Sequence, residues 1–341
     1  WLDDKGVLFS EVYYYGALIS SGWESQLTEL KALQANALEE HWQQIAKQYS
    51  HRLTAPLLIK NAQLFDSVNL KLIKNTSVLI VDGKIAKIGE HASTIEGATA
   101  RDKLKILDAK GKVLMPGLWD IHSHINQQRG LVSIAGGVTH TRDMGNNNEK
   151  TLQIKSDFDH QKTIGPRLYL AGFIDKKSDY SSSLGKIVSS LDEALDAVNW
   201  YADNGYIQIK LYASISPEWI APIAKQAHKR GLRLSGHIPA FVNASQAVTL
   251  GFDEINHSIM IFLNFLVKND VDTRTGIRFT AVAEGAGDID LSSKQVQDFF
   301  ALLKSNNTVV DPTVMGYVAM FEQQKGQMDP RYKNIAKHFP E

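Results

Sequence analysis

The chain contains no cysteine among its 341 residues. Disulfide bonds, cysteine-ligated zinc and thiol catalysis are therefore excluded. The absence fits the cytoplasm and the periplasm equally, so it leaves the compartment open. Histidine, carboxylates and a lysine-derived carbamate remain as the strong metal ligands that this sequence can offer.

The sequence also lacks an excess of either charge and lacks long apolar runs. Its 37 Lys and Arg balance 37 Asp and Glu, and the formal net charge is +0 at pH 7. This balance gives no electrostatic reason to expect nucleic acid or an anionic membrane as partner. The apolar runs are shorter than the roughly 18 residues of a membrane span, so we predict no transmembrane segment. Because the chain starts at Trp1, a signal peptide can have preceded it.

Three zones differ in their hydrophobic pattern, and their composition of 43% hydrophobic and 22% charged residues is typical of globular domains. Residues 1–55 form an N-terminal extension that is helical in part, because leucines recur at helical spacing from Leu27 onward. Residues 56–112 switch to an alternating pattern, with Asp82-Gly83 as a hairpin turn. We therefore predict a small antiparallel β-sandwich domain over residues 56–112.

From residue 113 to residue 341, short apolar runs alternate with helical segments, which predicts an α/β fold with a parallel sheet. The predicted strands are residues 113–120, 138–143, 167–174, 206–213, 233–238, 254–259 and 308–314. The clearest predicted helices are residues 190–204, 217–230 and 292–305, and Gly205 and Gly231 follow two of them as C-terminal caps. Seven such units predict a (β/α)8 TIM-type barrel that lacks its last unit in this chain.

Two histidines, His122 and His124, lie at the end of the first predicted barrel strand. Residues at i and i+2 on a strand point to the same side, so both imidazoles can reach one ion. The spacing alone also fits two strand-end histidines without a function. Barrel active sites, however, are built at the carboxyl ends of strands, which favours a metal site.

Lys210 lies on the fourth predicted strand, on the face that Gln208 and Tyr212 share and that points into the barrel. A bare ammonium is costly to bury, so the lysine either reaches solvent or an aspartate, or its amine reacts with CO2. The resulting carbamate is an anionic group with two oxygens, which can bridge two cations.

His237 and His257 lie at the ends of the next two predicted strands. His237 has the inward parity. His257 shares its parity with Ile255 and Ile259, so it is either a packed histidine or is redirected by a bulge or a strand end.

The run over residues 113–124, preceded by a β-hairpin, resembles the entry to the metal-dependent amidohydrolase superfamily. Four further strands of that superfamily have similar segments in this chain: residues 136–145, 209–213, Gly236-His237 and Asn256-His257. The amino-acid sequence of these segments most resembles the prolidase-like and imidazolonepropionase-like branch. The resemblance covers about residues 56–315. It implies that His122 and His124 bind one metal, that Lys210 is the carboxylated bridge, and that His237 and His257 hold the second metal.

The resemblance therefore implies a hydrolase of C–N bonds with two divalent ions, zinc first and manganese, cobalt or iron as alternatives. The expected substrate is a small molecule or short peptide with a peptide-like or cyclic amide, Xaa-Pro dipeptides among them. Two other interpretations stay open: a mononuclear deaminase-like or imidazolonepropionase-like hydrolase, and a non-catalytic barrel scaffold. A homo-oligomer is compatible with either.

Three further residues have less defined roles. Tyr212 can donate a hydrogen bond to the substrate, and Arg142 can bind a substrate carboxylate or form an internal ion pair with Asp143 or another carboxylate. Asp311 is unusual for the superfamily; contact with substrate is one interpretation, but we expect it to cap a helix or lie at the surface. The superfamily's aspartate on the eighth strand has no counterpart before Glu341, so the chain as written is expected to be catalytically impaired.

Overall fold

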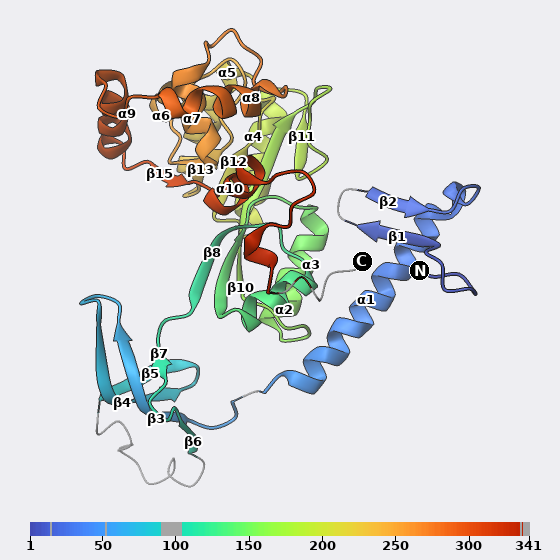
Figure 1. Cartoon of the computed structure of the whole chain (residues 1–341), viewed down its shortest axis with the longest axis vertical. Coiled ribbons are helices and arrows are strands. Elements are labelled where there is room, and N and C mark those ends of the chain that lie inside the picture. Colours follow the sequence, from blue (N-terminus) through green and yellow to red (C-terminus); the bar gives the residue numbers. More distant parts are fainter. Residues whose placement is uncertain (14–15, 52, 90–103, 335, 337–341) are drawn as a thin grey trace. The chain divides into compact units, whose positions relative to one another are not determined.

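A computed structural model describes residues 1–13, 16–51, 53–89, 104–334 and 336 (Figure 1). The chain divides into two compact units. The first comprises Trp1–Trp119, Gln127–Thr139 and Asp157–Pro166, and the second comprises Asp120–Asn126, His140–Ser156 and Arg167–Glu341. Each unit is described by itself.

The first unit begins with an antiparallel pair, β1 (Ser10–Tyr13) and β2 (Gly16–Ile19). A short 3-10 helix, η1 (Glu24–Gln26), leads into the helix α1 (Leu27–Tyr49). The helix predicted from the leucine spacing is therefore confirmed.

A small sheet follows in the first unit, with strand order β5-β4-β3-β6 and with β7 also paired to β3. Its strands are β3 (Leu57–Asp66), β4 (Lys71–Val81), β5 (Lys84–Gly89), β6 (Lys105–Asp108) and β7 (Val113–Leu114). Asp82 and Gly83 have φ of 49° and 72°, the left-handed conformation at both positions that the predicted hairpin turn requires.

The prediction of a wholly antiparallel β-sandwich is wrong for this sheet. β3, β4 and β5 are antiparallel, but β6 and β7 pair with β3 in parallel. Parallel neighbours need a long connection along the chain, and β4 and β5 lie between β3 and β6 in the sequence. In the described residues these strands form one mixed sheet and not two facing sheets.

The barrel sheet has the strand order β15-β14-β13-β12-β10-β9-β8, and β11 pairs with β10 off this path. The registers from β9 to β15 are parallel throughout. The strands are β8 (Leu118–Ser123), β9 (Val138–Asp143), β10 (Arg167–Lys176), β11 (Lys186–Val188), β12 (Gln208–Leu211), β13 (Arg233–Gly236), β14 (Glu254–Asn256) and β15 (Val309–Asp311). All seven predicted barrel strands are present, and the sheet is a nearly closed barrel.

The first predicted barrel strand, residues 113–120, is two strands. Val113 and Leu114 form β7 in the small sheet, and the barrel strand β8 starts at Leu118. Pro116-Gly117 separates them, since proline lacks the N–H that a continuous ladder needs.

Helices connect these strands, and the predicted ones over residues 190–204, 217–230 and 292–305 are confirmed as α4, α5 and α9. The helices are α2 (Gln127–Ala135), α3 (Asn148–Asp159), α4 (Leu191–Asp203), α5 (Pro217–Lys229), α6 (Ala244–Thr249), α7 (Ser258–Leu266), α8 (Ile277–Gly285), α9 (Lys294–Ser305) and α10 (Val314–Glu322), with the 3-10 helices η3 (Ala286–Asp288) and η4 (Pro330–Tyr332). Gly205 and Gly231 have φ of 76° and 72°, which confirms the predicted C-terminal caps.

The barrel core lies between the strands and these helices. Ile209 and Leu211 of β12 are completely buried, as are Ile220 and Ile223 of α5. The mainly apolar outward face of each strand thus fixes its register, and the other face is left to point inward. In the described residues, no strand follows β15. None of the described helices combines the length and the apolar character needed to span a bilayer.

Candidate active site

Four histidines gather at the carboxyl ends of the barrel strands. His122 lies on β8 and His124 just beyond it, while His237 and His257 directly follow β13 and β14. The ring centroid of His122 lies 5.8 Å from that of His124 and 4.7 Å from that of His257. The ring centroid of His257 lies 4.6 Å from that of His237. All four histidines predicted as ligands are therefore neighbours in one cluster, which we call the histidine cluster.

The backbone at the ends of β13 and β14 aims two of these rings. Gly236 has φ of +144°, and a Cβ on it would lie 2.1 Å from the carbonyl oxygen of Leu211 on β12. Only glycine allows this close approach, which sets the position of His237. His257 has φ of 71°, and its N–H donates to the carbonyl oxygen of Asp311 at 2.6 Å. The strand ends at Asn256, so the parity that argued against His257 does not apply to it.

Hydrogen bonds at Nδ1 orient three of the rings. His124 Nδ1 donates to the carbonyl oxygen of Gly145 at 2.6 Å, because a carbonyl can only accept. His122 Nδ1 lies 2.6 Å from Oδ2 of Asp311, and His257 Nδ1 lies 2.8 Å from Oγ1 of Thr313. With Nδ1–H donating, the lone pair of His122 and His124 is at Nε2. His237 differs, since its Nδ1 is buried without a hydrogen-bond partner among the described residues.

Three of the histidines, His122, His237 and His257, are held in the neutral form that binds metals. Burial lowers the pKa of both His122 and His257 to about 2, and the positive charge of Lys210 adds to the effect. Burial, together with neighbouring His257, also lowers the pKa of His237 well below its ordinary value. None of these rings therefore carries a proton on both nitrogens near neutral pH.

Lys210 lies inside the barrel on β12, where 2% of its surface is exposed. Its Nζ is 3.4 Å from Nε2 of His122, which confirms the inward direction predicted from strand parity. Burial lowers the pKa of this amine to about 8, while the carboxylates of Asp311 and Asp143 oppose that shift. A larger fraction of this amine is therefore neutral near pH 7 than for an ordinary lysine, and the neutral amine is the form that reacts with CO2.

Arg142 forms the internal ion pair that the sequence left open as an alternative to substrate binding. Its two terminal nitrogens donate to Oε2 and Oε1 of Glu254 at 2.9 and 2.6 Å, and one also donates to Gln208 at 2.9 Å. Its Nε donates to the carbonyl oxygen of Ile121. The partner is Glu254 rather than Asp143, which instead accepts from the backbone N–H groups of Ile125 and Gly145. Arg142 is thus occupied inside the barrel and is not proposed as a substrate ligand.

Asp311 is the residue that sequence reasoning placed wrongly. It is not at the surface, since 2% of it is exposed, and it does not cap a helix. Besides His122, its Oδ2 accepts from Nδ2 of Asn256 at 3.1 Å and lies 3.6 Å from Arg142. The signal was an aspartate at the inner end of a short apolar strand, but its partner lies 189 residues away and cannot be read from local spacing.

Two tyrosines border the histidine cluster. The ring of Tyr212 lies 4.2 Å from that of His237, in agreement with its predicted place near the site. The ring of Tyr317, from α10, lies 5.8 Å from that of His257. Tyr317 was missed because α10 follows the barrel strand as an ordinary apolar helix with no ligand spacing.

The chemistry of the donors suits a divalent metal such as zinc. Neutral imidazoles with fixed tautomers can bind a metal through the nitrogen that carries no proton. The Nδ1 of His237 is buried without a hydrogen-bond partner among the described residues, so it is also available as a ligand. The described side chains do not yet have the geometry of a metal site, because no three His, Asp or Glu residues among them are positioned to bind one ion together. The donor set therefore fits in kind, and metal binding would require side-chain adjustment.

No family model matches the chain. It is 42% identical over 71 residues to a dihydroorotase of Caldicellulosiruptor saccharolyticus, covering 21% of this chain and 15% of the relative. It is 32% identical over 155 residues to a dihydroorotase of Elusimicrobium minutum, covering 41% and 33%. An adenine deaminase of Rhizobium meliloti is 32% identical over 83 residues, covering 24% and 13%. The chain thus spans a third or less of these relatives.

Solved structures share the fold. A Xaa-Pro dipeptidase with bound methionine aligns with a TM-score of 0.51 and 16% identity, covering 75% of this chain and 78% of that one. Molinate hydrolase aligns with a TM-score of 0.52 and 13% identity, covering 83% and 78%.

The fold and the site define a β/α-barrel protein with four histidines and a buried lysine gathered at the strand ends. The sequence relatives narrow this class: segments of the chain are similar to dihydroorotases and to an adenine deaminase, in agreement with the resemblance to the metal-dependent amidohydrolase superfamily. Those relatives are amidohydrolases acting on C–N bonds. The resemblance seen in the sequence is confirmed.

Proposed function

We propose that this protein is a metal-dependent hydrolase of C–N bonds in amides. One observation carries the proposal: His122, His124, His237 and His257 meet beside buried Lys210 inside one barrel. Structural histidines are normally satisfied by hydrogen bonds, whereas His237 Nδ1 is buried and unpaired. A cluster of this kind is costly to build and suits metal binding.

The proposed ligands divide into two groups. His122 and His124 would hold one divalent ion and His237 and His257 a second, with Lys210 between them. To form the carbamate, the Lys210 ammonium would first lose one proton, and the neutral amine would then add to CO2 and release a second. An anion with two oxygens would thus replace a buried ammonium. Zinc suits imidazole and oxygen ligands best, and manganese, cobalt or iron are the alternatives.

Bound divalent ions would supply Lewis acidity, which polarises a carbonyl and acidifies water. The protein's own groups do the rest. Asp311 holds the proton of His122 on Nδ1 at 2.6 Å and thereby keeps Nε2 directed at Lys210. Tyr212, next to His237, is placed to donate its phenol proton in a hydrogen bond to a substrate carbonyl.

The scissile bond is proposed to be a peptide-like or cyclic amide. The likeness to a Xaa-Pro dipeptidase is one of fold, and dihydroorotases are among the relatives in sequence, so linear amides, including Xaa-Pro dipeptides, and cyclic amides both belong in the test. The similarity to an adenine deaminase favours a second candidate, a mononuclear deaminase-like hydrolase with unmodified Lys210.

The test measures metal content, lysine chemistry and activity on the chain purified with zinc. We expect tight zinc binding by the wild type and a carbamate carbon signal in NMR spectra under ¹³CO2, with slow hydrolysis of members of a panel of dipeptides, N-acyl amino acids and cyclic imides. Lys210→Ala should lose the carbamate signal and the activity. Arg230→Gln, at an exposed ion pair with Asp203, is the matched control.

Two results would decide against the binuclear proposal. Zinc bound no more tightly by the wild type than by a His122→Ala, His257→Ala variant would remove the metal site altogether. One equivalent of zinc with no carbamate signal, together with release of ammonia from adenine, would favour the deaminase-like alternative.

A further inference from the structure

Glu254 gathers donors from three side chains inside the barrel. It lies on β14 and is buried. Its Oε1 accepts from Nη2 of Arg142 at 2.6 Å and from Nδ2 of Asn256 at 2.9 Å, and its Oε2 accepts from Nη1 of Arg142 at 2.9 Å. Nε2 of Gln208 donates to Oε1 at 3.4 Å. These partners offset the cost of burying a carboxylate, and none of the three is a proposed metal ligand.

Arg142 extends this arrangement to β8. Its Nε donates to the carbonyl oxygen of Ile121 at 2.8 Å, and Ile121 directly precedes His122. Its Nη2 lies 3.6 Å from Oδ2 of Asp311. A guanidinium is planar and its donors have fixed directions, so the two bonds to Glu254 also fix where Nε points. Glu254 thereby holds the backbone that carries His122.

Asn256 extends the arrangement to Asp311. Besides Glu254, its Nδ2 donates to Oδ2 of Asp311 at 3.1 Å. The same Oδ2 lies 2.6 Å from Nδ1 of His122. Oδ1 of Asn256 is buried without a hydrogen-bond partner among the described residues. The two carboxylates therefore set the orientation of this amide, because both need its N–H groups, even though its oxygen stays unpaired.

His122 depends on these contacts because its strand lies at one end of the barrel sheet. The strand order starts at β15 and ends at β8, and among the described strands no register joins these two. The backbone pairing from β8 reaches β14 only through β9, β10, β12 and β13. His237 and His257 instead follow β13 and β14, which pair directly. The side chains around Glu254 are thus the short connection between His122 and the other side of the histidine cluster.

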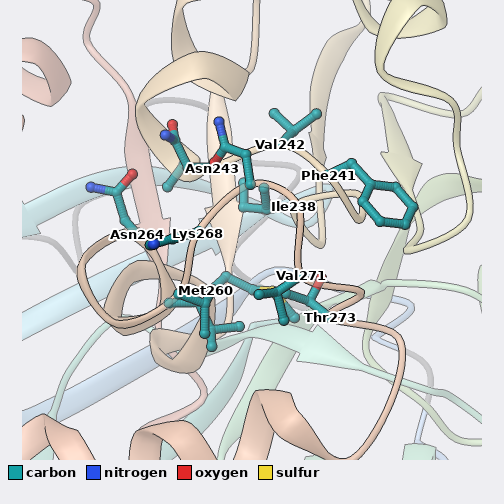
Figure 2. A pocket seen from close by; sticks show the side chains of 13 residues that line it. Ile238, Phe241, Val242, Asn243, Met260, Asn264, Lys268, Val271 and Thr273 are labelled. Atoms are coloured by element: carbon teal, nitrogen blue, oxygen red, sulfur yellow. The ribbon is translucent and has the colours of Figure 1, made fainter.

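Apolar packing supports the other side of the cluster. Ile238, which directly follows His237, lines a small cavity together with Met260 and Val271 (Figure 2). This cavity of about 10 Å³ holds no more than one water, so the side chains around it are closely packed. The polar connection through Glu254 therefore concerns His122 in particular.

We propose that Glu254 is a positioning residue for His122. It orients the guanidinium of Arg142 and the amide of Asn256, which together keep His122 with its proton on Nδ1 and with Nε2 free to bind a metal. The inference rests on the proposed hydrolase function, because His122 is one of the proposed ligands of that site.

The first measurement is made on the metal-free protein, so it does not depend on zinc. NMR spectra of the chain labelled with ¹⁵N-histidine detect the proton on Nδ1 of His122, which is identified by its absence from His122→Ala. A charge-assisted hydrogen bond to Asp311 should place this resonance far downfield in the wild type. In Glu254→Gln it should move upfield and exchange faster with water, because Arg142 loses its charged partner and turns toward Asp311.

The second measurement is zinc affinity, by competition with a chromophoric chelator. Glu254→Gln should bind zinc about tenfold more weakly than the wild type, as expected for an outer partner of a histidine ligand. Arg142→Lys keeps the charge but lacks the planar fork, so it should show a similar loss. Because Glu254 acts in part through Asp311, the double variant Glu254→Gln, Asp311→Asn should lose less affinity than the product of the two single losses.

The matched control is Asp175→Asn. It also removes a buried carboxylate from the barrel, at the end of β10, where that carboxylate accepts from the N–H groups of Ser214 and Ser182. This variant should keep both the His122 resonance and the zinc affinity of the wild type. Circular dichroism checks that each variant is folded, and Arg142→Lys tests the same contacts should Glu254→Gln fail to fold.

An unchanged His122 resonance in folded Glu254→Gln would overturn the proposal, as would equal changes in Glu254→Gln and Asp175→Asn. A shifted resonance with unchanged zinc affinity would also contradict it, because the orientation of the ring would then not serve the metal site. A wild type that binds no zinc would contradict the proposed hydrolase, while the resonance would still decide whether Glu254 positions His122.

Discussion

Asp311 links the first and last strands of the barrel sheet order. Its Oδ2 on β15 lies 2.6 Å from Nδ1 of His122 on β8. Burial raises the pKa of Asp311, and the charges of Arg142 and Lys210 oppose that shift. The carboxylate thus lies between the internal ion pair and the histidine cluster. It is a positioning residue for His122 in the proposed metal site.

Replacement of Asp311 by asparagine tests this role. The amide keeps the shape, but it gives His122 Nδ1 a weaker, neutral acceptor. We expect Asp311→Asn to bind zinc about tenfold more weakly, since outer carboxylate partners of histidine ligands typically contribute 10–100-fold to metal affinity. Competition with a chromophoric chelator measures the affinity.

The matched control is Asp298→Asn, which removes a carboxylate from an exposed pair with Lys294. It should bind zinc as the wild type does. Equal zinc affinity in Asp311→Asn and Asp298→Asn would show that Asp311 does not act through His122.

For single residues, strand parity predicted whether a side chain points into the barrel, but not which residue it contacts there. It placed Lys210 and Gln208 inside the barrel, and both make contacts there. It could not tell that Arg142 meets Glu254 rather than its neighbour Asp143, because those two strands come together only when the sheet curves. Partners of inward residues depend on barrel closure, which no local pattern encodes.

The ends of the strands decide the geometry of the site. The sequence located seven strands of the barrel sheet but missed the short β11, and it extended the strand at 254–259 beyond its end at Asn256. The apolar Ile259 that suggested a longer strand is buried in α7 instead. Over so few residues, hydrophobic periodicity cannot separate a strand from a buried helix that follows it. The turn at His257 depends on a positive φ, which cannot be predicted from a histidine at this position.

Asp175 shows how a strand end is tied to its neighbours. At the end of β10, its carboxylate accepts from the N–H groups of Ser214, which follows β12, and of Ser182. Burial raises its pKa to about 6 from 3.8, although these hydrogen bonds oppose the shift. Between these two pH values the folded state binds more protons than the unfolded state, so the free energy of unfolding falls as pH rises through this window.

The prediction is a pH-dependent difference between the wild type and Asp175→Asn, which cannot titrate at this position. From pH 4 to pH 7, the metal-free wild type should lose about 2 kcal/mol of stability relative to the variant. Urea unfolding at a series of pH values measures the difference. Asp298→Asn should show no such trend, and a flat difference for Asp175→Asn would mean that the carboxyl is not perturbed in the folded state.

For the whole molecule, composition and the order of motifs predicted a barrel together with a small β domain, and both are present. The division into three zones stays a prediction. What the sequence could not convey is that the two compact units alternate along the chain: Asp120–Asn126 belongs to the second unit, whereas Gln127–Thr139 belongs to the first. Hydrophobic periodicity describes one segment at a time and carries no information on which distant segments pack together.

This interleaving gives the proposed metal a structural effect that can be localised. His122 and His124 come from the short segment Asp120–Asn126, while Lys210, His237 and His257 come from the segment that starts at Arg167. A metal shared between these residues would fasten the short segment to the rest of its own unit. Binding only to the folded state stabilises it by about 2.7 kcal/mol at a ligand concentration 100 times the dissociation constant.

Zinc should therefore slow amide hydrogen exchange in β8 and at the ends of β12, β13 and β14, because it suppresses local opening of the second unit. The sheet of β3, β4 and β5 contains no proposed ligand, so its exchange should not change. Mass spectrometry of exchanged peptides measures both regions in one experiment. The double variant His122→Ala, His124→Ala should lose the protection at β8, and protection spread equally over both units would contradict a metal site confined to the barrel.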